Sequence, residues 1–326
     1  MSRVISYAEA LNEALHQEME KDENVFILGE DVARMGGEWG VTRGIWSKWP
    51  ERAKDTALSE QAIVGLACGA AICGLRPVAE MMVADFIAVT YDQLINNAAI
   101  LHFMFNGQVN CPIVVRAPQG AGSRLAYHHS HIIESWFMNI PGLVIVAPST
   151  PYDAKGLLIS AIEENNPVIF LEHKMLYGME GEVPEEYYAL PLFKAEVKRE
   201  GSDVTVVATQ KMLYLALQAA EQLDLDDGVQ VEVIDPRTLF PIDKTTIMNS
   251  VKKTGKLVIA QEGPKTMGYA AEISAIVAEE LFGYLKAPVK RVTSRDVHVS
   301  FAAVLEDYIV PKTEQIVQSV KEVLAS

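Results

Sequence analysis

The sequence predicts an α/β protein with two domains, each a mostly parallel sheet covered by helices. Three observations support this fold class. The length of 326 residues suits two domains. Short apolar runs alternate with helical patterns, and one stretch rich in Glu and Pro interrupts this alternation. Apolar runs without alternation are typical of strands that are buried on both faces of a parallel sheet.

The interruption suggests where the domains divide. From about Gly178 to Gly201 the sequence is rich in Glu and Pro, which is typical of a connection between domains. We therefore expect a first domain over residues 1–185, a linker over 186–202 and a second domain over 203–326.

The first domain begins with a predicted helix, because Ser6 and Glu9 have the spacing of a capping box. Strands and helices then alternate along the chain. The expected strands are Val25–Leu28, Val78–Val83, Ile113–Arg116, Leu143–Ala147 and Val168–Glu172. The expected helices include the one that starts at Glu60, Asp85–Phe105 and Pro151–Glu164.

Strands and helices are also predicted to alternate in the second domain. The expected strands are Val204–Ala208, Val229–Ile234 and Leu257–Gln261. The expected helices are Met212–Leu223, Asp243–Thr254, Tyr269–Leu285 and Thr313–Leu324.

Composition excludes several classes of function. The formal net charge is −15, and an acidic chain is a poor ligand for nucleic acid or for an anionic membrane surface. The cysteines Cys68, Cys73 and Cys111 are too few for a disulfide scaffold. We see no targeting segment and no uninterrupted apolar run of about 20 residues, so we expect a cytoplasmic protein without a membrane span, or a stromal one if it is organelle-encoded.

The helix that starts at Glu60 is the first unusual segment. Glycine in a helix costs about 1 kcal/mol relative to Ala, so Gly65 and Gly69 indicate that another backbone or a ligand approaches closely. Taken alone, Glu60 is more typical of an ordinary first-turn acid, which the helix dipole favours, than of a functional carboxylate.

The second unusual segment runs from Gly120 to His131, after a predicted strand. It carries His128, His129 and His131. Ligands bind in loops at the carboxyl ends of parallel strands, so a general acid or base here is one interpretation. A metal site is a weaker one, and a pair of partly exposed loop histidines is the ordinary alternative.

A third candidate is the end of the helix that closes at Glu164. The last carbonyls of a helix lack intrahelical partners and suit a hard cation, although on the pattern alone a hydrated helix end before a proline is the better explanation. The chain has no Walker loop, no dinucleotide-binding glycine motif and no nucleophile elbow. Asp227-Gly228 lacks the preceding Gly of a metal–diphosphate motif.

Taken together, the motifs resemble the beta subunits of thiamine-diphosphate-dependent 2-oxo acid dehydrogenases, of the pyruvate and acetoin dehydrogenase type. The resemblance follows the chain in order. Its main motifs are GEDV at 29–32, DTALSEQAIVG at 55–65, GLRPVAE at 74–80, HHSH at 128–131, NPVIFLEHKMLY at 166–177 and VEVIDPRTLFPID at 231–243.

The resemblance implies a pyrimidine-binding domain followed by a transketolase-type C-terminal domain. It also implies thiamine diphosphate as cofactor and an alpha-two beta-two heterotetramer. In the family, the alpha subunit carries the Gly-Asp-Gly motif that holds Mg²⁺ and the diphosphate. The absence of that motif here then means that this chain supplies half of a site.

The family also implies roles for individual residues. Glu60 matches the glutamate that bonds the pyrimidine ring nitrogen and favours the reactive imino tautomer. Phe86 matches the aromatic that packs on the aminopyrimidine, and Leu58 is expected in the same pocket, as is Ile87. Glu30 matches an acid beneath that pocket. His129 matches a histidine that assists decarboxylation or acyl transfer.

Two further features follow from the same resemblance. Ile113, Ala161, Ile162, Glu164 and Asn166 match a potassium site of relatives. The chain also departs from the family: His128 and His131 replace glutamines, and His298 lies where relatives often have prolines.

We therefore expect the beta subunit of an enzyme that decarboxylates a 2-oxo acid, foremost pyruvate. The acyl unit would pass to a lipoyl group on a dihydrolipoyl acyltransferase core. Acetoin and branched-chain 2-oxo acids are the alternatives within the family. A transketolase-like transferase would need a basic phosphate-binding cluster, which we do not find, and a non-catalytic assembly subunit need not keep Glu60 and His129.

Overall fold

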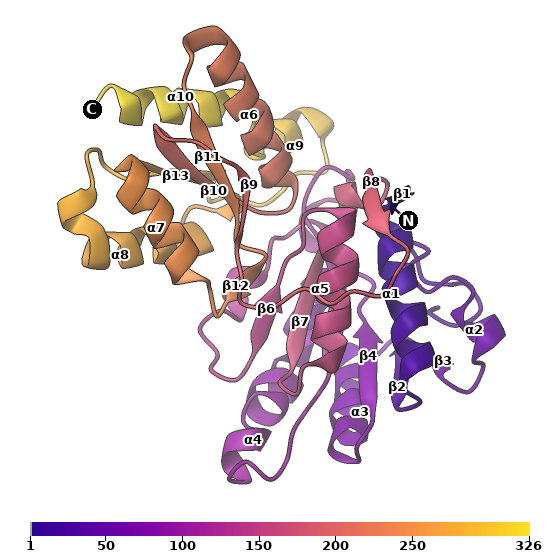
Figure 1. Cartoon of the computed structure of the whole chain (residues 1–326). Helices are drawn as coiled ribbons and strands as arrows, with labels where there is room; N and C mark the ends of the chain where they lie inside the picture. Colours follow the sequence, from indigo (N-terminus) through magenta and orange to yellow (C-terminus); the bar gives the residue numbers. More distant parts are fainter. Residues whose placement is uncertain (1) are drawn as a thin grey trace. The chain divides into compact units, whose positions relative to one another are not determined.

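The computed structural model describes residues 2–326, which form two compact units (Figure 1). The first unit contains the described residues up to Gln119 together with Phe137–Leu192. The second contains Gly120–Trp136 and Phe193–Ser326. The predicted boundaries at 185 and 202 stay a prediction, because this division by contacts also assigns a segment from the middle of the first half to the second unit.

A parallel sheet forms the centre of the first unit, with the strand order β6-β7-β5-β4-β2-β3. The strands are β2 (Val25–Gly29), β3 (Ala53–Asp55), β4 (Arg76–Glu80), β5 (Val114–Gln119), β6 (Val144–Val146) and β7 (Val168–His173). Strands β5 and β7 are buried at every position, which explains their continuous apolar runs.

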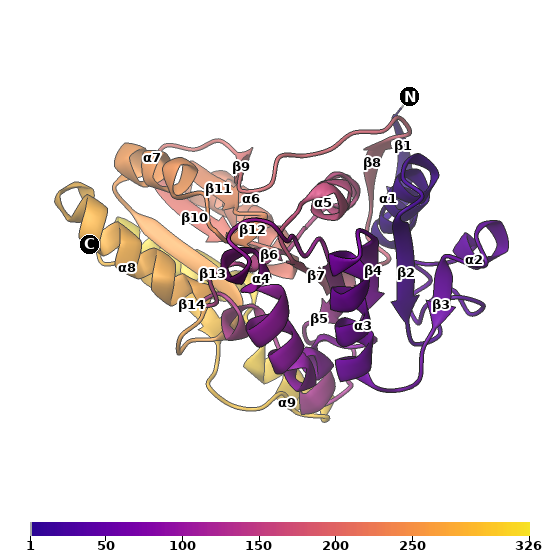
Figure 2. The same ribbon diagram turned by 90° about the horizontal axis from the view of Figure 1, so that it is seen from below.

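Helices cover both faces of this sheet. Figure 2 shows α1 (Tyr7–Lys21) and α5 (Pro151–Glu163) on one face and α3 (Glu60–Ile72) on the other. The predicted capping box is confirmed, since the Ser6 side chain accepts from the Glu9 backbone and the Glu9 carboxylate accepts from the Ser6 backbone. A short helix, α2 (Ile45–Lys48), precedes β3.

One expected helix is wrong in detail. The pattern over Asp85–Phe105 predicted a single helix, but the structure has a 3-10 helix at Ala84–Thr90, a π-helix at Asp92–Ala98 and α4 at Leu101–Met104. These three forms have different numbers of residues per turn, so one apolar period cannot describe them. Because π-helical turns are frequent at functional sites, this break identifies a segment of interest.

A small antiparallel pair also escaped the sequence analysis. Strand β1 (Ser2–Ser6) pairs with β8 (Glu180–Pro184), with Val4 opposite Glu182. Both strands are short and mostly polar, so neither gives an apolar signal.

The second unit has its own sheet, in the order β14-β13-β10-β11-β9, where only β9 is antiparallel. The strands of this sheet are β9 (Glu196–Arg199), β10 (Val204–Ala208), β11 (Val231–Asp235), β13 (Leu257–Pro264) and β14 (Lys290–Ser294), and the short strand β12 (Thr238–Phe240) is not part of it. The helices are α6 (Lys211–Asp227), α7 (Lys244–Thr254), α8 (Tyr269–Leu281), α9 (Ala303–Ile309) and α10 (Thr313–Leu324).

Helices α6 and α10 pack together against this sheet and enclose one apolar core. Its members include Val206, Leu213, Val233, Val258 and Ile316, all fully buried. The predicted strands and helices of this half are confirmed, apart from shifts at their ends. No helix among residues 2–326 is long and apolar enough to cross a membrane.

Candidate cofactor and active site

Acidic residues gather at the carboxyl ends of the strands of the first unit. Glu30 directly follows β2, and Glu80 is the last residue of the neighbouring β4. Gly29 lets these strands approach, because a Cβ atom there would lie 2.7 Å from the backbone oxygen of Glu80. The carboxyl edge of a parallel sheet is where ligands bind in this fold class.

Glu30 is a buried acid whose hydrogen bonding is incomplete. The residue is 8% exposed, and its Oε1 has no hydrogen-bond partner among residues 2–326. Burial raises its pKa above the usual range, and the negative charges of Glu60 and Asp31 raise it further. Glu30 therefore lies close enough to Glu60 for the charge of one carboxylate to affect the other.

Glu60 is the first residue of α3 and is half-buried. The preceding Ser59 makes no side-chain cap hydrogen bond, so the helix start is left open. Leu58 is 83% exposed, which is unusual for a large apolar side chain that has a helix beside it. Phe86, from the 3-10 helix packed against α3, is half-buried.

These residues fit the pyrimidine end of thiamine diphosphate. The orphaned Oε1 of Glu30 needs a polar partner, and the exposed Leu58 needs an apolar one. Glu60, Leu58, Phe86 and Glu30 all belong to the first unit, whereas His129 belongs to the second.

A buried charge network at the same sheet edge was missed by the sequence analysis. Arg116, in β5, donates from Nε and Nη2 to both carboxylate oxygens of Glu172, at 2.7 and 2.8 Å. Its Nη1 donates to Glu80 at 2.6 Å. Tyr177 donates its hydroxyl to Glu172 at 2.6 Å, and Trp39 stacks on the Tyr177 ring. The available signal was a charged residue inside an apolar strand.

This network is short of positive charge, since one guanidinium faces two carboxylates. Burial raises the pKa of Glu80, although Arg116 opposes that shift. Burial alone would lower the pKa of Arg116, but Glu172 and Glu80 raise it above its usual value. Glu80 therefore takes up a proton more easily than a carboxylate in water.

The exposed face of α3 differs from the sequence expectation. Within residues 2–326, no atom outside the helix's own backbone lies within 4 Å of a Cβ placed on Gly69, and a Cβ on Gly65 meets only the side chain of Gln93, at 3.7 Å. The expected close approach is therefore not made within the chain. Leu66, on the same face, is 61% exposed. A face of small and apolar residues that nothing covers is typical of a subunit contact.

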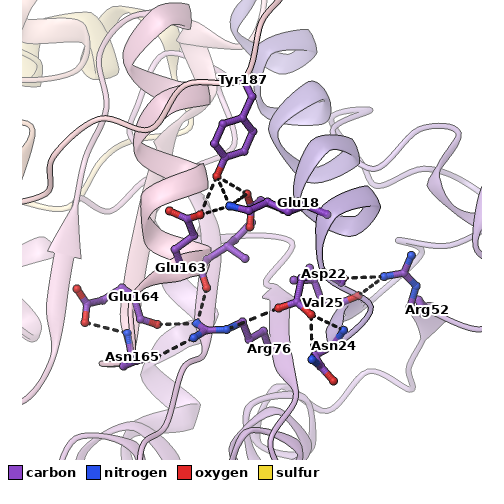
Figure 3. Close-up of polar contacts among 12 residues, drawn as sticks. Glu18, Asp22, Asn24, Val25, Arg52, Arg76, Glu163, Glu164, Asn165 and Tyr187 are labelled. Carbon is purple, nitrogen blue, oxygen red and sulfur yellow. Dashed lines mark hydrogen bonds and ion pairs between the residues drawn. The ribbon is translucent and has the colours of Figure 1, made fainter.

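The end of α5, where potassium was predicted, already holds a cation of the protein itself. Figure 3 shows the Arg76 guanidinium beside Glu164 and Asn165. Its Nη1 donates to the backbone oxygens of Ile162 and Glu164, at 2.8 and 3.1 Å. The Glu164 carboxylate accepts from the backbone and side chain of Asn166. Ile113 accepts from Val168 across the β5–β7 pair.

In the second unit, the loop that carries His129 is held by two buried acids. Glu262 accepts from the backbone of Ala121 at 2.7 Å, and Glu306 accepts from Gly122 at 2.5 Å. Arg124 also donates to Glu306, at 2.8 Å. Arg124 and Ala126 have positive φ angles of 60° and 64°, a strained conformation that residues other than glycine adopt mainly at functional sites.

His129 ends a single 3-10 turn, Tyr127–His129, and is half-buried. Its ring lies 4.8 Å from that of His128, and His298 lies between Tyr127 and His131, at 5.9 and 6.3 Å from their rings. The departures from the family motif thus form one cluster of aromatic rings. The described residues contain no group of His, Cys, Asp or Glu that could hold a metal ion.

A cavity of about 580 Å³ adjoins this cluster, within the second unit. Its lining includes His131, His298, Trp136 and Ser130. Ser130 is only 2% exposed, and its hydroxyl has no hydrogen-bond partner in the part of the chain that the structure describes. The volume lies in the range of small-molecule pockets.

Comparison with known proteins defines the class. Residues 3–180 match the family described as "Transketolase, pyrimidine binding domain", and residues 193–316 match "Transketolase, C-terminal domain". A solved structure titled "Split gene transketolase, inactive beta4 tetramer" has a TM-score of 0.81 and 23% identity, and the match covers 98% of each chain. The chain is thus a transketolase-type protein with both domains, and that structure supports the fold.

Closer relatives define the family. The chain is 46% identical to "Acetoin:2,6-dichlorophenolindophenol oxidoreductase subunit beta" of Cupriavidus necator, over 99% of this chain and 98% of that protein. It is 44% identical to "2-oxoisovalerate dehydrogenase subunit beta" of Bacillus subtilis and to "Pyruvate dehydrogenase E1 component subunit beta" of Rickettsia felis, over 98% of each chain. The chain belongs to this family of thiamine-diphosphate-dependent dehydrogenase beta subunits.

Proposed function

We propose that this chain, together with an alpha subunit, decarboxylates pyruvate and passes the acyl unit to a lipoyl group on a dihydrolipoyl acyltransferase core. The observation that carries the proposal is the acid pair at the sheet edge. Glu30 has a buried, unpartnered carboxylate oxygen, and the charge of Glu60 acts on it. Membership of the dehydrogenase family supports a role for this pair at the cofactor.

In the proposed site the residues of this chain bind and tune the pyrimidine end of thiamine diphosphate. Bound there, the cofactor supplies the electron sink for decarboxylation. Glu60 holds a proton between its carboxyl group and the pyrimidine ring nitrogen. Glu30 reinforces this role, because a second acid nearby favours the protonated state of the pair. Phe86 and Leu58 exclude water and orient the ring.

The alpha subunit is proposed on two grounds. The chain has no Gly-Asp-Gly motif, so the residues that bind Mg²⁺ and the diphosphate must come from another chain. The uncovered α3 face around Leu66 and Gly69 offers a contact surface directly after Glu60. We propose an alpha-two beta-two heterotetramer, in which the pocket beside Leu58 is completed by the partner.

His129 is proposed to assist decarboxylation or acyl transfer to the lipoyl group. Support comes from its loop, which two buried acids hold and which has strained residues at Arg124 and Ala126. Imidazole is the side chain best suited to proton transfer near neutral pH.

A potassium ion at Ile113, Ala161, Ile162, Glu164 and Asn166 is proposed as a structural element only. The donation of Arg76 to two of the carbonyls supports the expectation that this helix end attracts positive charge.

We also propose a cytoplasmic or stromal location, which is the location expected from the sequence.

Acetoin is the second candidate substrate. Two acetoin oxidoreductase beta subunits, of Cupriavidus necator and Bacillus subtilis, are each 46% identical to this chain, against 44% for the pyruvate dehydrogenase subunit of Rickettsia felis. Pyruvate and acetoin would both leave a two-carbon unit on the cofactor, so the proposed site residues of this chain suit either substrate. Turnover of pyruvate, acetoin and branched 2-oxo acids by the co-purified subunits separates them.

The test of the proposed site is Glu60→Gln in the complex. We expect assembly to persist and turnover to fall by at least about 100-fold, the usual range for loss of a proton-transfer group. Glu314→Gln is the matched control, because Glu314 is also a first-turn acid of a helix, and its side chain is more exposed than that of Glu60. Normal turnover by Glu60→Gln, or full activity of the isolated chain, would refute the proposal.

A further inference from the structure

Three cations surround one cavity of the second unit. The cavity has a volume of about 420 Å³, and its lining includes Lys265, Arg291 and Arg295. Among residues 2–326, none of these three side chains forms an ion pair or a hydrogen bond with a carboxylate. Such a cluster is unexpected in a chain with a net charge of −15, because acidic partners outnumber basic ones.

The pairing of β13 with β14 brings these cations together. Arg291 lies within β14, whereas Lys265 and Arg295 directly follow β13 and β14. The two strands are parallel neighbours, and Pro264 lies opposite Ser294 at their carboxyl ends. The carboxyl edge of a parallel sheet is where ligands bind in this fold class. Lys265 is distant from both arginines in the sequence, so the sequence analysis could not find this cluster.

Two contacts orient the guanidinium groups without neutralising them. Arg291 is half-buried, and its Nη1 donates to the backbone oxygen of Lys265 at 3.0 Å. The Cζ atom of Arg295 lies 4.3 Å from the centre of the Tyr308 ring. A guanidinium group presents several N–H donors in a rigid plane, so both arginines keep donors for a ligand.

The other polar groups of the lining do not cancel this charge. Asp296 is the acid among the described lining residues, and its carboxylate already accepts from the Thr266 backbone at 3.1 Å and from the Thr266 hydroxyl at 2.7 Å. Three cations and one carboxylate leave an excess of positive charge, which attracts an anion. Neutral side chains that can donate hydrogen bonds also line the cavity: Thr293, Gln315 and Ser319.

From this arrangement we infer that the basic pocket, formed by Lys265, Arg291 and Arg295, binds a small ligand that carries phosphoryl groups. A phosphoryl group brings up to about two negative charges and several acceptor oxygens, and guanidinium groups bind it through paired N–H···O bonds. The volume lies in the range of small-molecule pockets, which favours a small ligand over a protein segment. The inference is independent of the proposed function, because it uses no residue of the proposed cofactor site.

The test is a calorimetric titration of the full-length chain with inorganic diphosphate, without thiamine diphosphate or metal. We expect saturable binding with a dissociation constant below about 1 mM, and weaker binding as the salt concentration rises. Arg295 is exposed, so Arg295→Gln should fold normally. This variant should bind diphosphate at least about 10-fold more weakly, the usual loss for a hydrogen bond to a charged group.

Lys252→Gln is the matched control. Lys252 is also an exposed cation of the second unit, and its Nζ lies 5.7 Å from the centre of the Tyr284 ring, but it does not line the pocket. We expect this variant to bind diphosphate as the wild type does. Arg291→Gln should weaken binding, and Arg291→Lys, which keeps the charge, should recover part of the affinity. If the half-buried Arg291 variants fail to fold, Arg295→Gln and Lys252→Gln decide the test.

ADP is the second probe, because it separates a nucleotide from free diphosphate as the source of the phosphoryl groups. Binding of either one supports the inference, and the tighter one identifies the source. No binding of either up to about 10 mM, equal binding by the wild type and Arg295→Gln, or equal losses in Arg295→Gln and Lys252→Gln would each overturn it. Tighter binding of citrate or of an oligoglutamate peptide would also overturn it, since the pocket would then prefer carboxylates.

Discussion

Both units bury polar side chains at a parallel sheet, but the two sets of side chains differ in charge and in how completely they are hydrogen-bonded. In the first unit Arg116 faces two carboxylates, and Glu30 keeps an unpartnered oxygen. In the second unit the Thr205 hydroxyl, in the middle of the sheet, bonds to Ser250 at 2.6 Å and Thr254 at 2.8 Å. The hydroxyl groups of the second unit are neutral and hydrogen-bonded to one another. The acidic side chains of the first unit are charged, and one of their oxygens lacks a hydrogen-bond partner among the described residues.

The difference separates polar groups that serve the scaffold from polar groups that serve a ligand. A satisfied neutral cluster costs little and needs no further partner. Buried charges with an open position are costly and persist where function requires them. The comparison therefore supports the proposed ligand site at the sheet edge near Glu30 and Glu80 in the first unit.

The largest effect is expected for Arg116→Met in the isolated chain. Removing the guanidinium leaves Glu80 and Glu172 buried without a counter-charge, so the free energy of unfolding should fall by about 3–5 kcal/mol. Urea unfolding measures the change. The loss should be smaller at acid pH, where the carboxyls are protonated, and a loss below about 1 kcal/mol at neutral pH would contradict the described network.

A smaller loss is expected for Thr205→Val, the counterpart in the second unit. The shape is retained, and Ser250 and Thr254 keep other partners, including the donation of Thr254 to the Ser250 backbone oxygen at 3.2 Å. The free energy of unfolding should fall by about 1 kcal/mol, with no dependence on pH between 5 and 8. An effect as large as that of Arg116→Met would remove the distinction between the units.

Glu30→Gln should act in the opposite direction. The pKa of Glu30 is raised in the fold, so the wild-type chain loses stability as pH rises from the unfolded pKa, about 4.3, through the folded pKa. Gln does not ionise, so the variant should be more stable than wild type by up to about 1 kcal/mol at pH 8 and equal to it near pH 4. Thermal unfolding at both pH values measures this, and a destabilised variant at pH 8 would contradict the role of burial.

The smallest effect on the isolated chain is expected for Gly69→Ala. In the described part of the chain no atom outside the helix's own backbone lies near the added methyl group, and Ala is the better helix former, so the free energy of unfolding should rise by about 0.5 kcal/mol. Assembly with the alpha subunit, followed by size-exclusion chromatography, should nevertheless weaken. Gly283→Ala, which also meets open space but lies outside α3, should leave assembly unchanged. Equal assembly by both variants would exclude α3 as the contact face.

Much of this arrangement could be predicted from the sequence, because it depends on local signals. The capping box at Ser6 and Glu9 fixes the start of α1, and the apolar runs locate β5 and β7. The residues proposed for the pyrimidine pocket came from matching motifs. That Glu30 and Glu60 influence each other is a finding of the structure.

The rest depends on contacts between distant segments. Arg116 can be buried only because Glu80 and Glu172 stand on the neighbouring strands, and no local pattern reports strand order. The pairing of β1 with β8 joins opposite ends of the first unit and has no apolar signature. The broken helix over Asp85–Phe105 changes its hydrogen-bond pattern twice, which a single period cannot show.

Residues 120–136 belong to the second unit although they lie in the first half of the sequence, and this limits where the protein can be truncated. Cutting the chain after Leu192 would deliver both catalytic candidates, Glu60 and His129, on one fragment. That fragment would lack Glu262 and Glu306, to which the His129 loop is bonded. The histidine would be present in the fragment but no longer held in place, so truncations that preserve every proposed site residue can still abolish the site.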